Sequence, residues 1–405
     1  MSRPLFRFLG TEIRHLEQAG LAYPEMVLGS AQGPIISAFG RQLANFASSD
    51  YLGLCAHPAV KRAAISAVDT WGVGVASPRL ATGTLPVHAD LERALAEHLG
   101  AEEALVCASG YHANTGLFES LVGERDYVFC DEQSRPSLAD GIRLCRARVY
   151  SYRNQDMGHL EERLKRSRAA RFRVVVTDGV FALSGSVAPL RDIYGLATKY
   201  DALVAVDDSH GIGVLGAAGR GTHNQLGVES IDLVTGTFGT VLGGGAGGFV
   251  AGRKEILTWL RQKSRPHLTS TALAPPAVAA ALKCLEIVRT EPQRQETLAR
   301  NVAFFRRALL DHGQSVMEGE HPAVAVMIRD AVTAQRLTDL LHRKDVFAIG
   351  FCHPVVPEDT ARIRFQVTML HSDKALRHAA DAVAEGVAHL EAFAQRKRAR
   401  PDGSD

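Results

Sequence analysis

Short apolar segments that end in polar residues alternate with helical segments in the middle of the chain. Three of them have the length and aliphatic content of buried strands: residues 173–181 (RVVVTDGVF), 202–211 (ALVAVDDSHG) and 232–239 (DLVTGTFG). Residues 190–200, between the first two, have the pattern of an amphipathic helix. This rhythm predicts a mostly parallel sheet covered by helices. Because ligands of such sheets bind at the carboxyl ends of the strands, we expect a site near residues 207–210 and 235–240.

The character of the chain changes at about Pro275, where long helical segments begin. An alternating stretch at residues 361–367 and a last helix to about residue 398 follow, which indicates a smaller α+β domain. We therefore divide the chain into four parts: an N-terminal helical segment (1–45), a large α/β domain with a cofactor-type pocket (46–275), a small C-terminal α+β domain (276–395) and a basic flexible tail (396–405).

Composition narrows the functional classes. The 405 residues are 46% hydrophobic and 22% charged, and the net charge of +2 gives no electrostatic reason to expect nucleic-acid binding. No apolar run is long enough to span a bilayer, and the N-terminus is too short in its apolar part for a signal peptide. Six scattered cysteines argue against a disulfide framework and against a metal site. We expect a cytoplasmic protein that binds neither membranes nor nucleic acid.

The predicted strand ends carry residues that could do chemistry. Asp207 supplies a carboxylate, His210 an imidazole and Thr237 a hydroxyl, and a glycine-rich run follows at residues 242–248. Glycine lets backbone N–H groups approach an anion, so this set suits a phosphate. The same residues would also suit a tight strand-to-loop turn, and both interpretations stay open on this signal alone.

Ordered segments along the whole chain resemble the α-oxoamine synthases, and most closely their 2-amino-3-ketobutyrate CoA ligase branch. The segments include NFASSDYLGL, ASGYHANTG, TDGVF, YDALVAVDDSHGIG, GRGTHNQLGV, LVTGTFG, LGGGAGGFVAGRKE, RQKSRPHLTSTALAPP and PVVPEDTARIR. The resemblance implies the fold-type I architecture of pyridoxal phosphate (PLP) enzymes and a homodimer with active sites at the interface. It also implies a condensation of an amino acid with an acyl-CoA or acyl carrier protein thioester.

The resemblance assigns roles to single residues. Asp207 matches the aspartate that pairs with the pyridinium nitrogen, and His210 matches the histidine near the phenolic oxygen of the cofactor. Arg364 matches the arginine that clamps the carboxylate of the amino acid, for which a guanidinium fork is suited. The residues that match phosphate ligands are Gly110, Tyr111, Thr237 and, toward the phosphate of the neighbouring subunit, Ser270.

Several residues depart from the family pattern at the cofactor and substrate positions. Thr240 replaces the lysine that forms the Schiff base, and Arg135 stands in place of the histidine that stacks on the pyridine ring. Ala182, Ser184 and Ser49 are further replacements. Because threonine has no amine, we expect no covalently bound cofactor at this position. Lys254 and Lys263 are near in sequence, but they lie past the glycine run, on a predicted helix of the large domain.

These departures lead to a first hypothesis, a PLP-independent acyltransferase. An acyl-CoA or phosphopantetheine thioester would be the donor, and an amine or hydroxyl would be the acceptor. His210 would act as general base, and Asp207 could orient it if the pocket lets the two approach. The substrate- or anion-binding residues of this hypothesis are Gly110, Tyr111, Arg135, Ser137, Thr237, Thr240, Ser270 and Arg364.

Two other hypotheses remain open. The chain could be a non-catalytic partner of a lysine-bearing paralogue, whose phosphate site the segment LTSTALAPP would complete. Alternatively, it could catalyse the family condensation with PLP held non-covalently.

Overall fold

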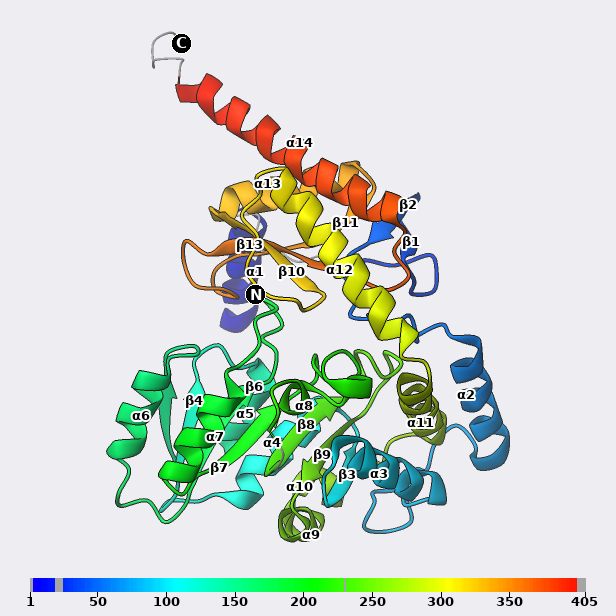
Figure 1. Cartoon of the computed structure of the whole chain (residues 1–405), viewed down its shortest axis with the longest axis vertical. Coiled ribbons are helices and arrows are strands. Elements are labelled where there is room, and N and C mark those ends of the chain that lie inside the picture. Colours follow the sequence, from blue (N-terminus) through cyan, green and yellow to red (C-terminus); the bar gives the residue numbers. More distant parts are fainter. Residues whose placement is uncertain (1–2, 19–24, 229–230, 399–405) are drawn as a thin grey trace.

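The larger domain is built on a seven-stranded sheet with the strand order β3-β9-β8-β7-β6-β4-β5 (Figure 1). The computed structural model describes residues 3–18, 25–228 and 231–398. All neighbouring strands of this sheet are parallel except β9, which is antiparallel to β3 and β8. The strands are β3 (Glu103–Cys107), β4 (Tyr127–Asp131), β5 (Arg148–Tyr152), β6 (Arg173–Asp178), β7 (Leu203–Asp207), β8 (Leu233–Thr237) and β9 (Gly248–Gly252).

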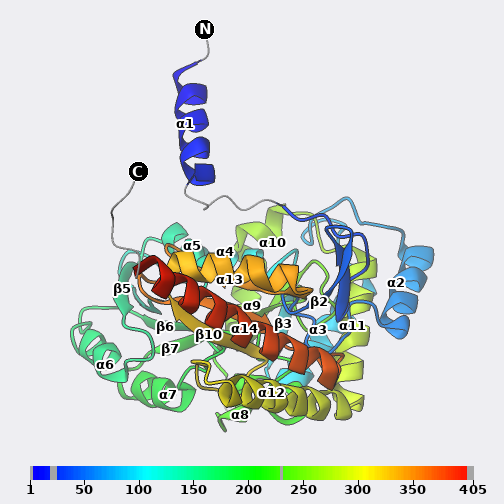
Figure 2. The same ribbon diagram turned by 90° about the horizontal axis from the view of Figure 1, so that it is seen from above.

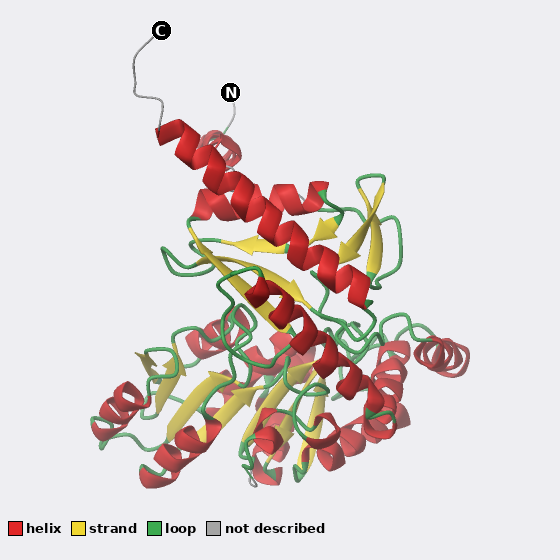
Figure 3. Cartoon of the chain, turned by 45° about the horizontal axis from the view of Figure 1, so that its top comes forward, coloured by secondary structure: helices red, strands yellow, loops and turns green. Residues whose placement is uncertain are grey.

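Both faces of this sheet are buried, which explains the near-continuous apolar strands of the sequence. Val174 and Val176 point to one face, where they pack with side chains of α4, α5 and α9. Val175 points to the other face and packs with side chains of α6 and α7. Figure 3 shows the helices on the two sides of the strands. The predicted mostly parallel sheet covered by helices is therefore present.

The helical segments of this domain follow the strands in alternation over much of its length. They are α2 (Pro58–Trp71), α3 (Pro86–Leu99), α4 (Gly110–Leu121), α5 (Pro136–Leu144), α6 (Met157–Lys165), α7 (Leu190–Lys199), the 3-10 turn η1 (Ala217–Gly219), α8 (Thr222–Gln225), α9 (Lys254–Lys263), α10 (Arg265–Thr269) and α11 (Pro275–Thr290). Although α11 begins at the predicted domain boundary, it packs on α2 and α3 of the larger domain.

The smaller domain combines two three-stranded sheets, ordered β1-β2-β11 and β10-β13-β12, with three helices. Its strands are β1 (Ile35–Ala38), β2 (Arg41–Asn45), β10 (Ala323–Arg329), β11 (Val346–Phe347), β12 (Ile349–Phe351) and β13 (Ala361–Gln366). Its helices are α12 (Gln293–Asp311), α13 (Ala331–Arg343) and α14 (Asp373–Arg398). In Figure 1 this domain lies above the carboxyl ends of the parallel strands.

Two details of the predicted division differ from the structure. Residues 35–45, placed in a helical segment, form β1 and β2, because β2 pairs with β11 from the far end of the chain. Residues 396–398, placed in the tail, belong to α14, whereas residues 399–405 lie outside the described residues.

Helix α1 (Pro4–Gln18) stands away from the body of the molecule in Figure 2. None of its residues is buried, although several are large and apolar. Over the described ranges, the chain contains no helix with the length and apolar character that a membrane span requires.

Candidate active site

Two buried aspartates end neighbouring strands and face each other in the sheet. Asp178 is the last residue of β6, Asp207 is the last residue of β7, and the two are partners in the parallel register. Thr235 of β8 is the next partner across the sheet from Asp207. Because a buried carboxylate is costly unless it is paired, the groups that contact these two aspartates define the site.

Arg135 pairs with both aspartates. It precedes α5, and its Nε lies 2.6 Å from Asp178 Oδ1 while its Nη1 lies 2.9 Å from Asp207 Oδ1. Its backbone N–H also donates to Asp178 Oδ2 at 2.8 Å. Burial raises the pKa of Asp178 to about 6, although the guanidinium opposes this rise. Arg135 is thus the cation that pairs with both aspartates, and these three residues form the strand-end cluster.

Asp207 accepts hydrogen bonds at both carboxylate oxygens. Its Oδ1 accepts from the Ser209 backbone N–H at 3.0 Å in addition to Arg135, and its Oδ2 accepts from Asn114 Nδ2 at 2.7 Å. Thr235 Oγ1 lies 3.2 Å from the same Oδ2. The expectation that Asp207 could orient His210 is therefore wrong in this structure, because these donors take up the carboxylate.

His210 is held by Tyr51 instead. Its Nδ1 lies 3.0 Å from the phenolic oxygen of Tyr51, a residue of the segment that joins β2 to α2. Burial, with the charges of Arg135 and other neighbours, keeps the pKa of His210 well below its usual range. Burial also raises the pKa of the Tyr51 phenol to about 12. Both side chains are consequently neutral at neutral pH.

The start of α4 and the end of β8 form the predicted phosphate cradle. A Cβ on Gly110 would lie 2.8 Å from Thr237 Cβ, so glycine is required for the helix to approach the strand this closely. Ser109 caps the helix through its Oγ. The N–H of Tyr111 in the first turn has no partner within the helix, and the helix N-terminus favours an anion.

Thr240 lies in the turn after β8. Its Oγ1 donates to the carbonyl oxygen of Ser209 at 2.7 Å, and the residue is buried. The two lysines close to it in sequence, Lys254 and Lys263, are the first and last residues of α9. Helix α9 covers the lower part of the sheet in Figure 1, away from the strand ends.

The remaining predicted residues are distributed around this cluster. Ser137 Oγ accepts from Asn114 Nδ2 at 3.0 Å, which links α5 to the aspartate network. Arg364 of β13 reaches from the smaller domain and donates to the carbonyl oxygen of Ala182 at 3.2 Å. Ser270 follows α10 and lines a separate small hollow with His267. In the single chain, Ser270 is therefore not part of the strand-end cluster.

The sequence analysis did not identify five further residues of the site: Tyr51, Asn114, Asp178, His321 and Gln366. Asp178 had a signal, because it ends a predicted buried strand as Asp207 does. The others come from distant segments, and their polar contacts do not follow from any local pattern. No group of three or more histidine, cysteine, aspartate or glutamate side chains in the described ranges is placed to hold a metal ion.

Known proteins resemble the chain along nearly its whole length. Residues 41–383 match the family of class I and II aminotransferases. The 2-amino-3-ketobutyrate coenzyme A ligase of Salmonella typhimurium is 41% identical over 386 residues, covering 94% of this chain and 97% of that protein. The 8-amino-7-oxononanoate synthase of Petrotoga mobilis is 38% identical over 371 residues, covering 91% and 94%.

A solved structure shows the same likeness in three dimensions. A serine palmitoyltransferase from S. paucimobilis, with a bound PLP–myriocin aldimine, superimposes with a TM-score of 0.91 at 27% identity. The superposition covers 96% of this chain and all of the other. The predicted fold-type I architecture is confirmed.

The comparisons correct the expectation about the cofactor. We expected a pocket without a covalently bound cofactor, but a solved serine palmitoyltransferase of the same fold, 27% identical with a TM-score of 0.91, holds PLP as an internal aldimine. The relatives named above likewise belong to a family of PLP enzymes. These findings contradict the expectation of a pocket that has lost the cofactor of its relatives, and a PLP-independent acyl transfer is not supported.

Proposed function

We propose, since this chain belongs to the class I and II aminotransferase family and within it to the α-oxoamine synthases, that it condenses an amino acid with an acyl-CoA thioester. In this reaction the amino acid loses a proton from its α-carbon, that carbon forms a bond to the thioester carbonyl carbon, and the carbon–sulfur bond breaks. CoA leaves as the thiol after taking up the proton. PLP is the proposed cofactor, and it supplies the electron sink that stabilises the carbanion of the amino acid.

The observation that carries this proposal is the meeting of a phosphate cradle, a buried carboxylate and an imidazole at one edge of the sheet. Gly110, Tyr111 and Thr237 would hold the cofactor phosphate, because glycine at 110 brings the start of α4 against β8. Asp207 would accept a hydrogen bond from the ring nitrogen. None of these proposed contacts involves position 240.

We propose that two of the departures from the family pattern, Thr240 and Arg135, are natural replacements. Thr240 stands at the position of the aldimine lysine, where its hydroxyl is bonded to the Ser209 carbonyl. Arg135 takes one of the acceptor positions of Asp207. An incoming cofactor would therefore compete with this guanidinium for the carboxylate.

Arg364 is the proposed ligand of the amino-acid carboxylate. It extends from β13 toward the larger domain, where its Nη1 contacts Ala182 O, and its charge is among those that depress the pKa of His210. A guanidinium fork binds a carboxylate in two places, which fixes the orientation of the substrate. His210, neutral and close to both arginines, is the proposed proton acceptor.

A cytoplasmic homodimer is the proposed working form. The six cysteines are all free, as expected in a reducing compartment. Ser270, which does not reach the strand-end cluster of its own chain, is proposed to contact the phosphate site of the second copy.

Release of free CoA tests the proposal. Purified protein is incubated with PLP, a panel of small amino acids and short-chain acyl-CoA thioesters, and the thiol is measured by its reaction with a chromogenic disulfide. We expect thiol release that requires all three components. Thiol release without PLP, or no release with any pair of substrates, would contradict the proposal.

Asp207→Asn and Asp126→Asn form a matched pair for this assay. Both aspartates are buried and paired with an arginine, but Asp126 lies outside the site, where it bonds Arg171. We expect Asp207→Asn to lower kcat/KM by about 10- to 100-fold, because a hydrogen bond to a charged group contributes about 1.5–3 kcal/mol. Asp126→Asn should retain wild-type activity per folded protein.

A further inference from the structure

A chain of polar contacts connects the backbone just after β2 to His210. Gln366 Nε2 donates to the carbonyl oxygen of Ala47 at 2.7 Å. Gln366 Oε1 lies 2.7 Å from the phenolic oxygen of Tyr51, and that oxygen lies 3.0 Å from His210 Nδ1. All of these side chains except Ala47 are buried, so their protons must be distributed among themselves rather than shared with water.

The orientation of the Gln366 amide is fixed by its first contact. Ala47 O can only accept a hydrogen bond, so the amide atom 2.7 Å from it must be the NH2 group. The amide oxygen therefore faces Tyr51 and Ser49. Ser49 Oγ, at 2.9 Å, donates to this same oxygen.

The Tyr51 proton is then fixed as well. Two oxygen atoms at 2.7 Å repel each other unless a proton lies between them, and the amide oxygen carries none. The phenol, which burial keeps protonated, must donate to Gln366 Oε1. Its oxygen is left as an acceptor toward His210 Nδ1.

We propose that this relay of Gln366, Tyr51 and His210 holds His210 in the Nδ1–H tautomer, so that Nε2 carries a lone pair and no proton. Nδ1 donates to the Tyr51 oxygen, and Nε2 has no hydrogen-bond partner among the described residues. Nε2 is also not among the fully buried polar atoms without a partner in the described chain, so part of its surface is accessible. Tyr51 and Gln366 are thereby positioning residues for the proton acceptor.

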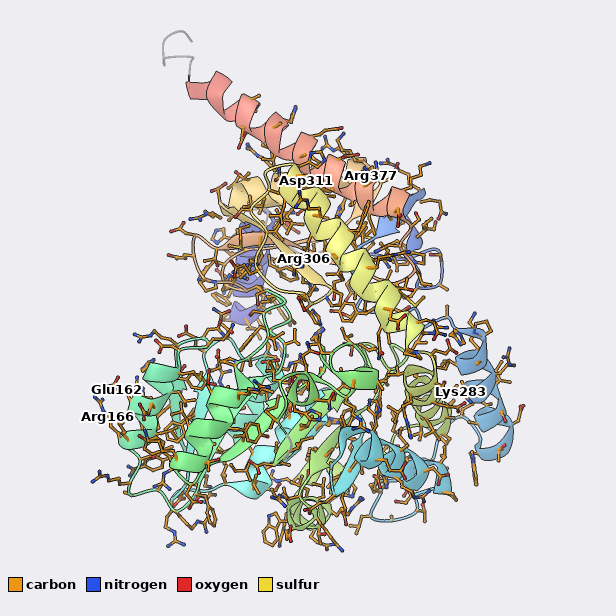
Figure 4. All side chains as sticks on the ribbon, in the orientation of Figure 1. Glu162, Arg166, Lys283, Arg306, Asp311 and Arg377 are labelled. Atoms are coloured by element: carbon orange, nitrogen blue, oxygen red, sulfur yellow. The ribbon has the colours of Figure 1, made fainter. Side chains whose placement is uncertain are left out.

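The backbone of His210 is held by a second histidine with the opposite tautomer. Ala323 N–H donates to His321 Nδ1 at 3.0 Å, so His321 carries its proton on Nε2 and donates it to His210 O, also at 3.0 Å. Arg306 of α12, labelled in Figure 4, donates to Met317 O and fixes the loop that carries His321. The imidazole of His210 is therefore constrained from both its ring and its main chain.

The catalytic role of this relay rests on the proposed function. The assignment of the tautomer rests only on the hydrogen bonds. An Nε2 lone pair can accept a proton from the substrate only if Nε2 is unprotonated beforehand. The inverted tautomer would present an N–H at the same place. The relay therefore decides whether the imidazole enters the reaction as a base.

The tautomer can be read directly from the full-length protein. Histidine labelled with ¹⁵N at both ring nitrogens is incorporated, and two-dimensional long-range ¹⁵N–¹H spectra are recorded, with His210→Gln used to assign the signal. We expect the Nδ1–H pattern for His210 and the Nε2–H pattern for His321, His88 and His371, whose Nδ1 atoms accept from backbone N–H groups. An Nε2–H pattern for His210 would overturn the inference.

Gln366→Met and Ser49→Ala separate the relay from general packing. Methionine fills the space of glutamine but cannot accept from Tyr51, so the phenol becomes free to donate to Nδ1 and the tautomer should invert. Ser49→Ala removes the other donor to the same amide oxygen without freeing the phenol, and the tautomer should stay as in the wild type. An unchanged tautomer in Gln366→Met would contradict the relay.

The kinetic test is kept separate from the spectroscopic one. If the relay serves catalysis, Gln366→Met should lower kcat in the thiol-release assay by about 100-fold or more, with a much smaller change in KM. A wild-type protein without thiol release would overturn the proposed function and leave the tautomer result standing. An inverted tautomer with wild-type kcat would overturn the catalytic part of the inference alone.

Discussion

Arg135 occupies an acceptor atom of Asp207 that the proposed cofactor would need. It holds Asp207 Oδ1 at 2.9 Å, where the proposed ring nitrogen would need an acceptor. We expect Arg135→His to raise the affinity for PLP by about tenfold, because it removes a competing charge-assisted hydrogen bond. The dissociation constant is measured by the change in PLP absorbance on titration with the protein.

Arg171→His is the matched control, since Arg171 pairs with the buried Asp126 outside the site. Its affinity for PLP should equal that of the wild type. If Arg135→His binds PLP no more tightly than Arg171→His, then Arg135 does not compete with the cofactor.

Asp208 is a second single residue that leads to a prediction, here on how the stability of the protein depends on pH. Burial raises the pKa of its carboxyl to about 7. Its Oδ1 has no partner among the described residues, and its Oδ2 accepts from the Thr222 N–H at 2.7 Å. In the unfolded state the carboxyl has a pKa of about 3.9, so between about pH 4 and 7 only the folded state keeps the proton. The contribution of Asp208 to the free energy of unfolding therefore falls as the pH rises from about 4 to 7.

Asp208→Asn cannot take up or lose this proton. The free energy of unfolding of Asp208→Asn relative to wild type should therefore increase with pH by about 1 kcal/mol per pH unit between pH 5 and 7, and level off above pH 7. Urea titrations at a series of pH values measure it. A difference that is independent of pH would show that Asp208 titrates normally.

At the scale of elements, the parallel strands and the helices between them could be predicted from the sequence. The strands β6 and β7 contain continuous apolar runs because both faces of the sheet are covered, and this burial leaves a clear signal in the sequence. Asp207, at the end of such a run, was found for the same reason.

Contacts between distant segments left no comparable signal. Tyr51 and Gln366 are 315 residues apart, and their hydrogen bond exists only because β13 packs against the segment after β2. The pairing of β2 with β11 depends in the same way on tertiary structure. Arg135 was singled out by its departure from the family pattern, but its bonds to two strand ends depend on the register of β6 and β7.

Helix α1 gives the prediction at the scale of elements. Its apolar residues Leu5, Leu9 and Leu16 are 61%, 44% and 47% exposed in the single chain. Exposed apolar surface is unfavourable by about 25 cal/mol per Å², and a second copy of the chain is the proposed cover. Light scattering coupled to gel filtration should give a dimer for the wild type and a shift toward monomer for Leu9→Asp.

Ile65→Asp is the control for this prediction. Ile65 is an apolar residue of α2, 61% exposed in the chain, so its substitution also adds a charge to an exposed helix. It should leave the dimer intact. A wild-type monomer, or equal effects of the two substitutions, would show that α1 does not contribute to the interface.

At the scale of the whole molecule, the two domains together make the proposed site. The larger domain supplies the phosphate cradle, Asp207 and His210, whereas the smaller domain supplies Arg364 and Gln366. The latter two lie on β13, and both contact segments outside their own sheet. The central claim is that this arrangement binds PLP even though position 240 is threonine.

Equilibrium dialysis of the full-length protein against PLP, and in parallel against pyridoxal, which lacks the phosphate, tests this claim most directly. We predict saturable binding of one PLP per chain and at least tenfold weaker binding of pyridoxal, because the cradle of Gly110, Tyr111 and Thr237 holds the phosphate through charge-assisted hydrogen bonds, each contributing about 1.5–3 kcal/mol. Absence of saturable PLP binding, or equal binding of the two compounds, would contradict the account.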